Sequence, residues 1–142
     1  MPKTVLNTVE VNYLKEIYRA WEKNIQPTTG YLADLFSVKP PSAFDVLNRL
    51  AEKKMLERTG WGKFVLTARG MATVSKIIHN HRILETYFYK ELGLDLSEAC
   101  LQAARIDQQV GESLVKRMCE KLNFPTTCIH GNEVKHRGCR NE

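Results

Sequence analysis

Hydrophobic residues recur at helical spacing along most of the chain. In residues 11–24, VNYLKEIYRAWEKN, apolar side chains lie three and four positions apart, which predicts an amphipathic helix. The segment 30–38, GYLADLFSV, predicts a short second helix whose expected buried residues are Leu32, Leu35 and Phe36. A third helix is expected to begin at Pro41, because proline suits the first turn of a helix. Its expected buried stripe consists of Phe44, Val46, Leu47 and Leu50.

The spacing of apolar residues changes after residue 55. Short apolar segments on either side of a glycine-containing turn at 59–63 predict a two-stranded hairpin. A long helix is then expected over about 68–91, followed by shorter helices over about 97–108 and 111–123. The order of helix, short helix, helix, hairpin and long helix predicts a mostly α fold with an N-terminal winged helix-turn-helix.

The net charge adds a functional constraint. The chain carries a formal charge of +5 and has a pI near 9.1, and much of the positive charge falls between residues 52 and 82. This positive charge favours a polyanionic partner, either nucleic acid or an anionic membrane surface. Because no apolar run approaches the about 20 residues that cross a bilayer and the start does not resemble a secretion signal, we expect a cytoplasmic protein without a membrane partner.

The third predicted helix presents a polar face suited to DNA. A helix of this kind fits the major groove and offers side chains to base edges, while the basic hairpin meets phosphates. The expected base-reading residues are Ser42, Asp45, Asn48 and Arg49. Those expected near the DNA backbone are Lys39, Pro41, Arg58, Lys63 and Arg69. Winged helices also serve as protein-interaction modules, so double-stranded DNA is favoured but is not the only choice.

Two groups of residues are candidates for metal chemistry. His81 and Glu85, in the stretch HNHRILETYF, lie four residues apart and therefore on one face of the long helix, as a metal site or as a hydrogen-bonded structural pair. Four cysteines fall in the last 43 residues: Cys100, Cys119, Cys128 and Cys139. They are core residues, redox-active thiols, or ligands of an iron–sulfur cluster or, less favoured, of zinc. His79 is expected to face solvent, and His136 could join the cysteines.

Motifs along nearly the whole chain resemble the metal-dependent repressors typified by the diphtheria toxin repressor and the manganese transport regulator. They are YLKEIY, VKPPSAFDVLNRLAEKKMLER, LTARG, HRILETYF, GLD and CIHGN, in this order. The resemblance implies a homodimer, paired through the helices after the hairpin, that binds a palindromic operator when a divalent metal is bound.

The chain departs from this family at the principal metal site. The positions that match its ligands are Asn12, Ala104, Asp107 and Gln108, a set that coordinates weakly or not at all. The family's ancillary site corresponds to His81, Glu85 and Cys100, which provide an alternative site for Fe²⁺, Mn²⁺ or Zn²⁺.

The resulting hypothesis is a dimeric DNA-binding regulator that responds to iron, redox state or another metal signal. Its expected domains are a DNA-binding winged helix-turn-helix at 1–70, a helical dimerisation and sensing domain at 71–124, and a Cys/His-containing tail at 125–142. The alternative is a winged-helix DNA-binding or interaction protein that has lost the sensor. An enzyme is not expected, because no nucleophile with its base, phosphate-binding glycine loop or paired-carboxylate motif occurs.

Overall fold

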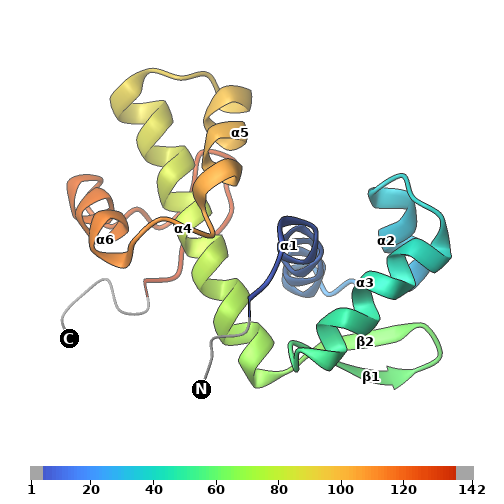
Figure 1. Cartoon of the computed structure of the whole chain (residues 1–142). Helices are drawn as coiled ribbons and strands as arrows, with labels where there is room; N and C mark the ends of the chain where they lie inside the picture. Colours follow the sequence, from blue (N-terminus) through green and yellow to red (C-terminus); the bar gives the residue numbers. More distant parts are fainter. Residues whose placement is uncertain (1–4, 137–142) are drawn as a thin grey trace. The chain divides into compact units, whose positions relative to one another are not determined.

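The computed structural model describes residues 5–136 and divides the chain into two compact units, 1–75 and 76–142. The first unit is a winged helix-turn-helix (Figure 1). Its elements are α1 (Thr8–Glu22), α2 (Thr29–Leu35), α3 (Pro40–Glu52), β1 (Leu56–Gly60), β2 (Lys63–Leu66) and the start of α4 (Ala68–Leu92). The second unit contains the rest of α4, then α5 (Leu96–Ile106) and α6 (Glu112–Lys121).

Local signals explain where α1 begins and how it is held. The Asn7 side chain accepts from the backbone N–H of Glu10 at 2.8 Å, and Glu10 Oε1 accepts from the Asn7 N–H at 2.9 Å, which is a capping box. The Glu10 carboxylate is fully buried and lies 2.7 Å from the Lys53 ammonium, just after α3. The Glu10 side chain therefore both caps α1 and connects it to the end of α3.

The hairpin and the start of α4 pack closely on the chain after α3. β1 and β2 pair antiparallel with an irregularity between Arg58 and Gly60. The Thr67 side chain donates to the Lys54 carbonyl at 2.6 Å. A Cβ at Gly70 would lie 2.0 Å from the Met55 carbonyl oxygen, so only glycine allows this approach.

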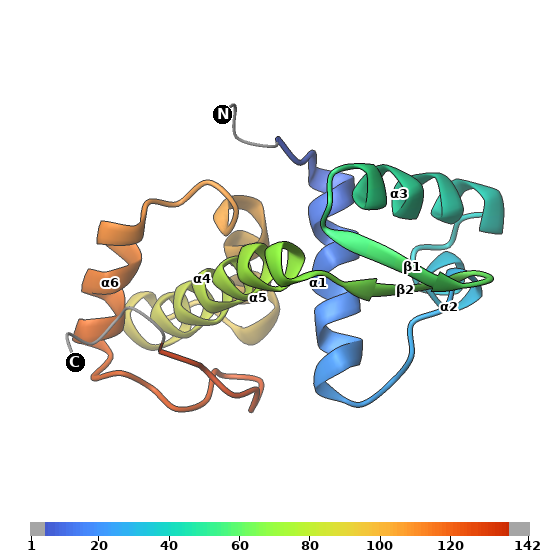
Figure 2. The ribbon, with the colours of Figure 1, turned by 90° about the horizontal axis from the view of Figure 1, so that it is seen from below.

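The second unit has its own apolar cluster, formed by Ile83, Val115, Cys119, Cys128 and Val134. The last two members come from the segment after α6, which turns back on itself: Val134 donates to the Thr126 carbonyl at 2.9 Å, and Thr127 pairs with Glu133. Figure 2 shows this segment in orange and red beyond α6. Part of the expected tail is therefore packed into the helical unit.

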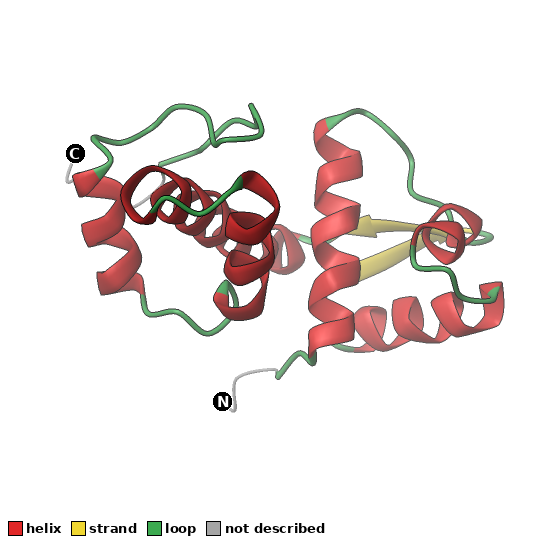
Figure 3. Cartoon of the chain, turned by 90° about the horizontal axis from the view of Figure 1, so that it is seen from above, coloured by secondary structure: helices red, strands yellow, loops and turns green. Residues whose placement is uncertain are grey.

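The predicted fold class is confirmed: the described chain is mostly helical with one small sheet (Figure 3). Every predicted helix and the hairpin are present. The expected burial of Leu35 is wrong, because its side chain is 47% exposed. Phe36 is half-buried and stacks on Tyr13 with ring centroids 4.2 Å apart. None of the described helices is both long and apolar enough to cross a bilayer.

Candidate functional site

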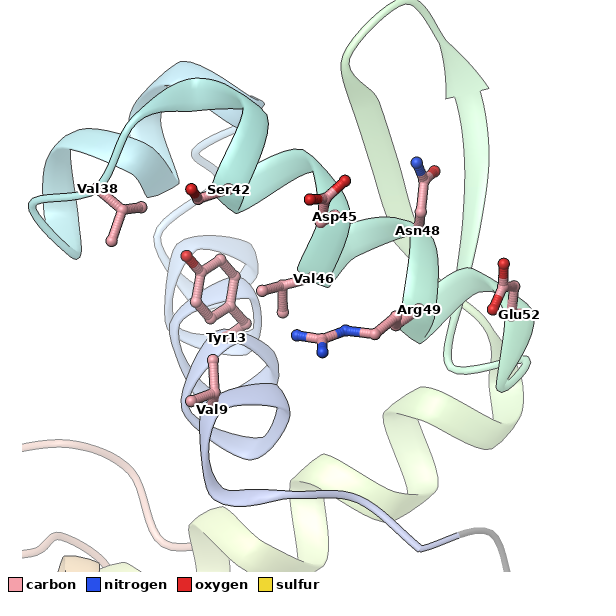
Figure 4. Close-up of a pocket in the computed structure, with 9 residues that line it drawn as sticks. All are labelled: Val9, Tyr13, Val38, Ser42, Asp45, Val46, Asn48, Arg49 and Glu52. Carbon is pink, nitrogen blue, oxygen red and sulfur yellow. The ribbon is translucent and has the colours of Figure 1, made fainter.

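The polar face of α3 is open to solvent in the first unit. Ser42, Asp45 and Arg49 are exposed, and Asn48 is half-buried. Figure 4 shows Asp45 and Asn48 projecting from one side of α3, whereas Arg49 extends towards the α1 side. These side chains line a pocket. The other residues that line it are Val9, Tyr13, Val38, Val46 and Glu52. The predicted base-reading residues thus line one pocket, with Arg49 on the side nearer α1.

The predicted backbone-contacting residues are also accessible. Lys39 precedes α3 as its N-cap, Pro41 lies in its first turn, and both are exposed, as are Lys63 and Arg69. The Arg58 guanidinium lies 5.4 Å from the ring centre of Phe44 and 5.3 Å from that of Trp61. The aromatic rings therefore hold this cation on the hairpin, beside a tryptophan that is 92% exposed.

A buried polar cluster occupies the second unit. His81 and Glu85 lie one turn apart on α4, and Asp107 is the C-cap of α5. His81 Nδ1 lies 3.1 Å from Asp107 Oδ2, and Asn80 donates to the Asp107 carbonyl at 3.0 Å. Asn80, His81, Glu85 and Asp107 are all buried. Through these contacts, Asn80 and His81 hold the C-terminal end of α5 against α4.

The other ring nitrogen of His81, Nε2, faces two further side chains that could bind a metal. His81 Nε2 lies 3.2 Å from Glu85 Oε2 and 3.6 Å from the Cys100 sulfur. With its Nδ1–H donated to Asp107, the His81 ring would coordinate a metal through Nε2 once the metal displaces the proton that Nε2 shares with Glu85. The structure therefore brings together the three residues of the alternative metal site, His81, Glu85 and Cys100, with ligand atoms within 4.8 Å of one another.

Glu85 is also shared with a second set of donors. Its Oε2 lies 3.1 Å from His130 Nδ1, and its carboxylate is hydrogen-bonded to the Cys128 thiol. A tight turn delivers both residues: Cys128 N–H donates to the Asn132 carbonyl at 2.9 Å, and Gly131 has a φ of +81° that favours glycine. The CIHGN motif thus folds against the Glu85 carboxylate.

The ionisation of this cluster follows from burial and proximity. Burial opposes the charged form of His81, but hydrogen bonds and charges from Asp107 and Glu85 outweigh it and raise the pKa of His81. Burial likewise opposes the charged form of Glu85, but hydrogen bonds with His81 and Cys128 and the nearby histidines lower its pKa. Burial and Glu85 together raise the pKa of Cys128.

The donor set fits a divalent cation. Glu85 Oε2 is buried and lies 3.2 Å from His81 Nε2 and 3.1 Å from His130 Nδ1. The carboxylate therefore lies where imidazole and thiol side chains from different segments meet. Imidazole, carboxylate and thiolate together are ligands of Fe²⁺, Mn²⁺ and Zn²⁺.

Three of the four positions that match the family's principal site are exposed. Ala104 and Gln108 are exposed on or just after α5, and Asn12 is exposed on α1. Asp107 is 1% exposed, and its carboxylate is directed at His81. The residue in the position of a principal ligand therefore orients His81.

The expected cysteine-ligated cluster finds no support. Among residues 5–136, no group of three close donors contains two cysteines: Cys100 and Cys128 each lie beside Glu85, and Cys119 lies beside two histidines. Cys139 is outside the described residues. An iron–sulfur cluster needs several thiolates around one site, which this arrangement of the described cysteines does not provide.

Sequence reasoning missed the roles of two contributors to these sites. Asp107 appeared only as a degenerate ligand, because its contact with His81 joins residues 26 positions apart. His79 was expected to face solvent but is half-buried against the ring of His136. The CIHGN motif, in which a cysteine and a histidine are separated by a single residue, was the one sequence signal of further metal-binding side chains beside Glu85.

The chain thus combines a winged helix-turn-helix with a helical unit that contains a buried group of histidine, cysteine and carboxylate side chains. Residues 67–135 match the family model described as the iron-dependent repressor metal-binding and dimerisation domain. This match and the relatives below support the predicted resemblance to the metal-dependent repressors typified by the diphtheria toxin repressor.

Individual relatives agree with this assignment. The iron-dependent repressor IdeR of Mycobacterium leprae (strain TN) is 26% identical over 130 residues, covering 92% of this chain and 56% of that protein. A manganese-dependent transcriptional repressor in complex with manganese is 29% identical, with a TM-score of 0.79 over 89% of this chain and 58% of that one.

The regulator ScaR with bound Zn²⁺ is 26% identical, with a TM-score of 0.75 over 91% of this chain and 60% of that one. These relatives are named as repressors and not as enzymes. This chain spans little more than half the length of the curated relatives.

Proposed function

We propose that this protein is a homodimeric transcriptional regulator that binds double-stranded DNA in response to a divalent metal. The observation that carries the proposal is the position of His81, whose Nδ1 contacts Asp107 while its Nε2 faces Glu85 and Cys100. A carboxylate behind a histidine fixes its tautomer and raises its affinity for metal. Metal responsiveness therefore has a physical basis in this chain although the principal-site ligands are changed.

His81, Glu85 and Cys100 would hold the metal, and Cys128 and His130 offer further donors on the other side of Glu85. When bound, the cation supplies positive charge to two buried carboxylates, Glu85 and Asp107. The protein's part is to hold these donors on α4, α5 and the CIHGN turn. Because the donors come from three segments, a cation that binds them all favours one packing of this unit.

DNA recognition is assigned to α3 and the hairpin. Ser42, Asp45, Asn48 and Arg49 would read base edges in the major groove. The residues assigned to the phosphates are Lys39, Pro41, Arg58 and Lys63, Pro41 acting through the first turn of the helix. Two copies of this unit in a symmetric dimer call for a palindromic operator.

Exposed apolar side chains in the second unit support a homodimer. Leu96, Leu101 and Ile106 on α5 are 44%, 56% and 40% exposed, and Leu92 at the end of α4 is 59% exposed. A monomer would leave these groups in water, whereas an isologous interface would bury them. The matched family model is itself named for dimerisation.

The test begins by selecting a binding site from a random duplex library with the full chain and Mn²⁺ or, under anaerobic conditions, Fe²⁺. Fluorescence anisotropy then measures affinity for that site with each metal and with chelator. Glu85→Gln should abolish the metal response, since the buried amide cannot replace the carboxylate. The matched control Glu91→Gln, exposed on the same helix, should retain it.

Two results would contradict the proposal. Affinity that is unchanged by metal or chelator would support the alternative, a winged-helix protein that has lost the sensor. Failure to select any duplex, with a folded dimer confirmed by circular dichroism and light scattering, would rule out DNA as the partner.

A further inference from the structure

A second group of donors lies in the helical unit, apart from the residues around Glu85. It consists of His79 from α4, Cys119 from α6 and His136 from the segment after α6. One ligand atom from each lies within 4.8 Å of the others. The group contains no carboxylate, in contrast to the Glu85 site, so its chemistry is that of a softer metal.

The orientation of His136 is set by the backbone. Its Nε2 lies 2.6 Å from the Pro125 carbonyl oxygen, to which only a ring N–H can donate. The lone pair of the neutral ring is then on Nδ1, which lies 3.3 Å from the Cys119 sulfur. A ring N–H donated to a backbone carbonyl is the usual support of a metal-binding histidine.

The spacing also suits a shared cation. Zinc binds sulfur at about 2.3 Å and imidazole nitrogen at about 2.0–2.1 Å, so two such ligands in tetrahedral geometry lie about 3.5 Å apart. The sulfur–nitrogen distance of 3.3 Å between Cys119 and His136 is close to that value. The two donors could therefore reach one zinc ion with little movement.

The cysteine of this group lies in apolar surroundings. Cys119 is fully buried in the apolar cluster with Ile83 and Val115. Phe124 packs edge-on against His136, with ring centroids 5.9 Å apart.

We propose that His79, Cys119 and His136 form a second metal site that binds Zn²⁺ and fastens the segment after α6 to α4 and α6. Binding forms a zinc–sulfur bond and releases the thiol proton of Cys119 to solvent, with no change in oxidation state. The three protein ligands leave the fourth position on zinc open to a further donor. The role is structural: zinc joins three elements of one unit, independently of the metal response assigned to Glu85.

The first test measures zinc affinity in the full chain carrying Glu85→Gln, which removes the shared ligand of the other site. The protein is kept reduced, stripped with chelator and titrated with Zn²⁺ against a chromophoric competitor. This variant should bind one zinc ion tightly. Adding His136→Gln should weaken that binding by about 100-fold or more. Adding Lys135→Gln, an exposed neighbour in the same segment, should not change it.

Two further measurements sharpen the result. Co²⁺ in the Glu85→Gln protein should give a thiolate charge-transfer band that Cys119→Ala and His136→Gln each remove, which shows ligation and not only stability. Zinc should also slow amide hydrogen exchange over residues 126–134, and His136→Gln should cancel this effect. Circular dichroism verifies that each variant is folded.

The proposal is overturned if the Glu85→Gln protein binds no zinc, or if His136→Gln leaves its zinc affinity intact. The first outcome would mean that the Cys119 thiol only donates a hydrogen bond to His136. Unchanged exchange over residues 126–134 with zinc bound would refute the fastening role. None of these results depends on DNA binding, so they are independent of the regulator proposal.

Discussion

His81 Nδ1 lies 3.1 Å from Asp107 Oδ2, and both side chains are buried. The contact joins the middle of α4 to the last turn of α5 and leaves Nε2 facing Glu85 and Cys100. Asp107 occupies a position where relatives of this chain are expected to carry a principal metal ligand. Here it supports a histidine of the other site, so a residue that looks like a weakened ligand has a defined role.

Removing this support should weaken metal binding without abolishing it. Asp107→Asn keeps the shape of the side chain but loses the negative charge that favours metal-bound His81. The affinity for Mn²⁺, measured by isothermal titration calorimetry, should fall by about 10–100-fold. Glu91→Gln, an exposed acid on α4, should leave the affinity unchanged. Equal affinities in Asp107→Asn and wild-type protein would refute the role assigned to Asp107.

Substitutions of base-reading residues and of phosphate-contacting residues should have different effects on DNA binding. Asn48→Ala should relax specificity at one base position at a cost of about 1–3 kcal/mol. Lys63→Ala should instead weaken binding to all duplexes and reduce the slope of log affinity against log salt by about 1. Lys121→Ala, exposed on α6 outside the winged helix, provides the control. A change in base preference with Lys63→Ala would contradict the assignment.

Glu10 predicts a pH-dependent contribution to stability. Burial opposes its charged form, but the Asn7 N–H and Lys53 outweigh burial and lower its pKa below the ordinary 4.5. The stabilisation is therefore present above about pH 4.5 and is lost as pH falls through the lowered pKa. At pH 7, Glu10→Gln should reduce the free energy of unfolding in urea by about 1–3 kcal/mol.

This deficit should shrink in acid, because protonated Glu10 resembles glutamine. Glu16→Gln is the matched control on the same helix; its partner Arg19 lies at the partly exposed surface, where an ion pair contributes about 0–1 kcal/mol. A deficit for Glu10→Gln that stays constant from pH 7 to pH 3 would show that the charge is not responsible.

Two glycines in helices should respond oppositely to alanine. Gly70→Ala places a methyl group 2.0 Å from the Met55 carbonyl oxygen, so the backbone must shift, and the cost is expected to be about 1–3 kcal/mol or more. Gly30→Ala meets nothing closer than 3.9 Å and should be neutral or stabilise α2 by up to about 1 kcal/mol. Thermal unfolding of the two variants tests this contrast. Equal melting temperatures would refute the close approach at Gly70.

The order of elements could be predicted from the sequence because it depends on local periodicity. Helical spacing, the prolines near residue 40 and the glycine-containing turn at 59–63 each act over a few residues. The hairpin and all six helices follow from such signals. Burial was less predictable: Leu35 fits an apolar stripe but is 47% exposed, because tertiary neighbours decide which apolar residues are covered.

The candidate site was only partly predictable for the same reason. His81 and Glu85 lie on one helix face through i, i+4 spacing, which a sequence displays directly. It depends on the packing of α4, α5 and the last segment whether Cys100, Asp107 and the CIHGN turn reach His81 and Glu85. The four cysteines appear as one set in sequence, but the structure distributes the described ones among different partners.

By itself the sequence determined the winged-helix order, the polar reading face of α3, the His81–Glu85 pair and the resemblance to metal-dependent repressors. Only the tertiary structure decided that Asp107 supports His81, that Cys128 and His130 reach Glu85, and that His79, Cys119 and His136 meet. The physical reason is the distance along the chain over which each interaction acts. Periodicity and caps act within a turn or two of chain, whereas a metal site needs donors from distant segments within a few ångströms of one point.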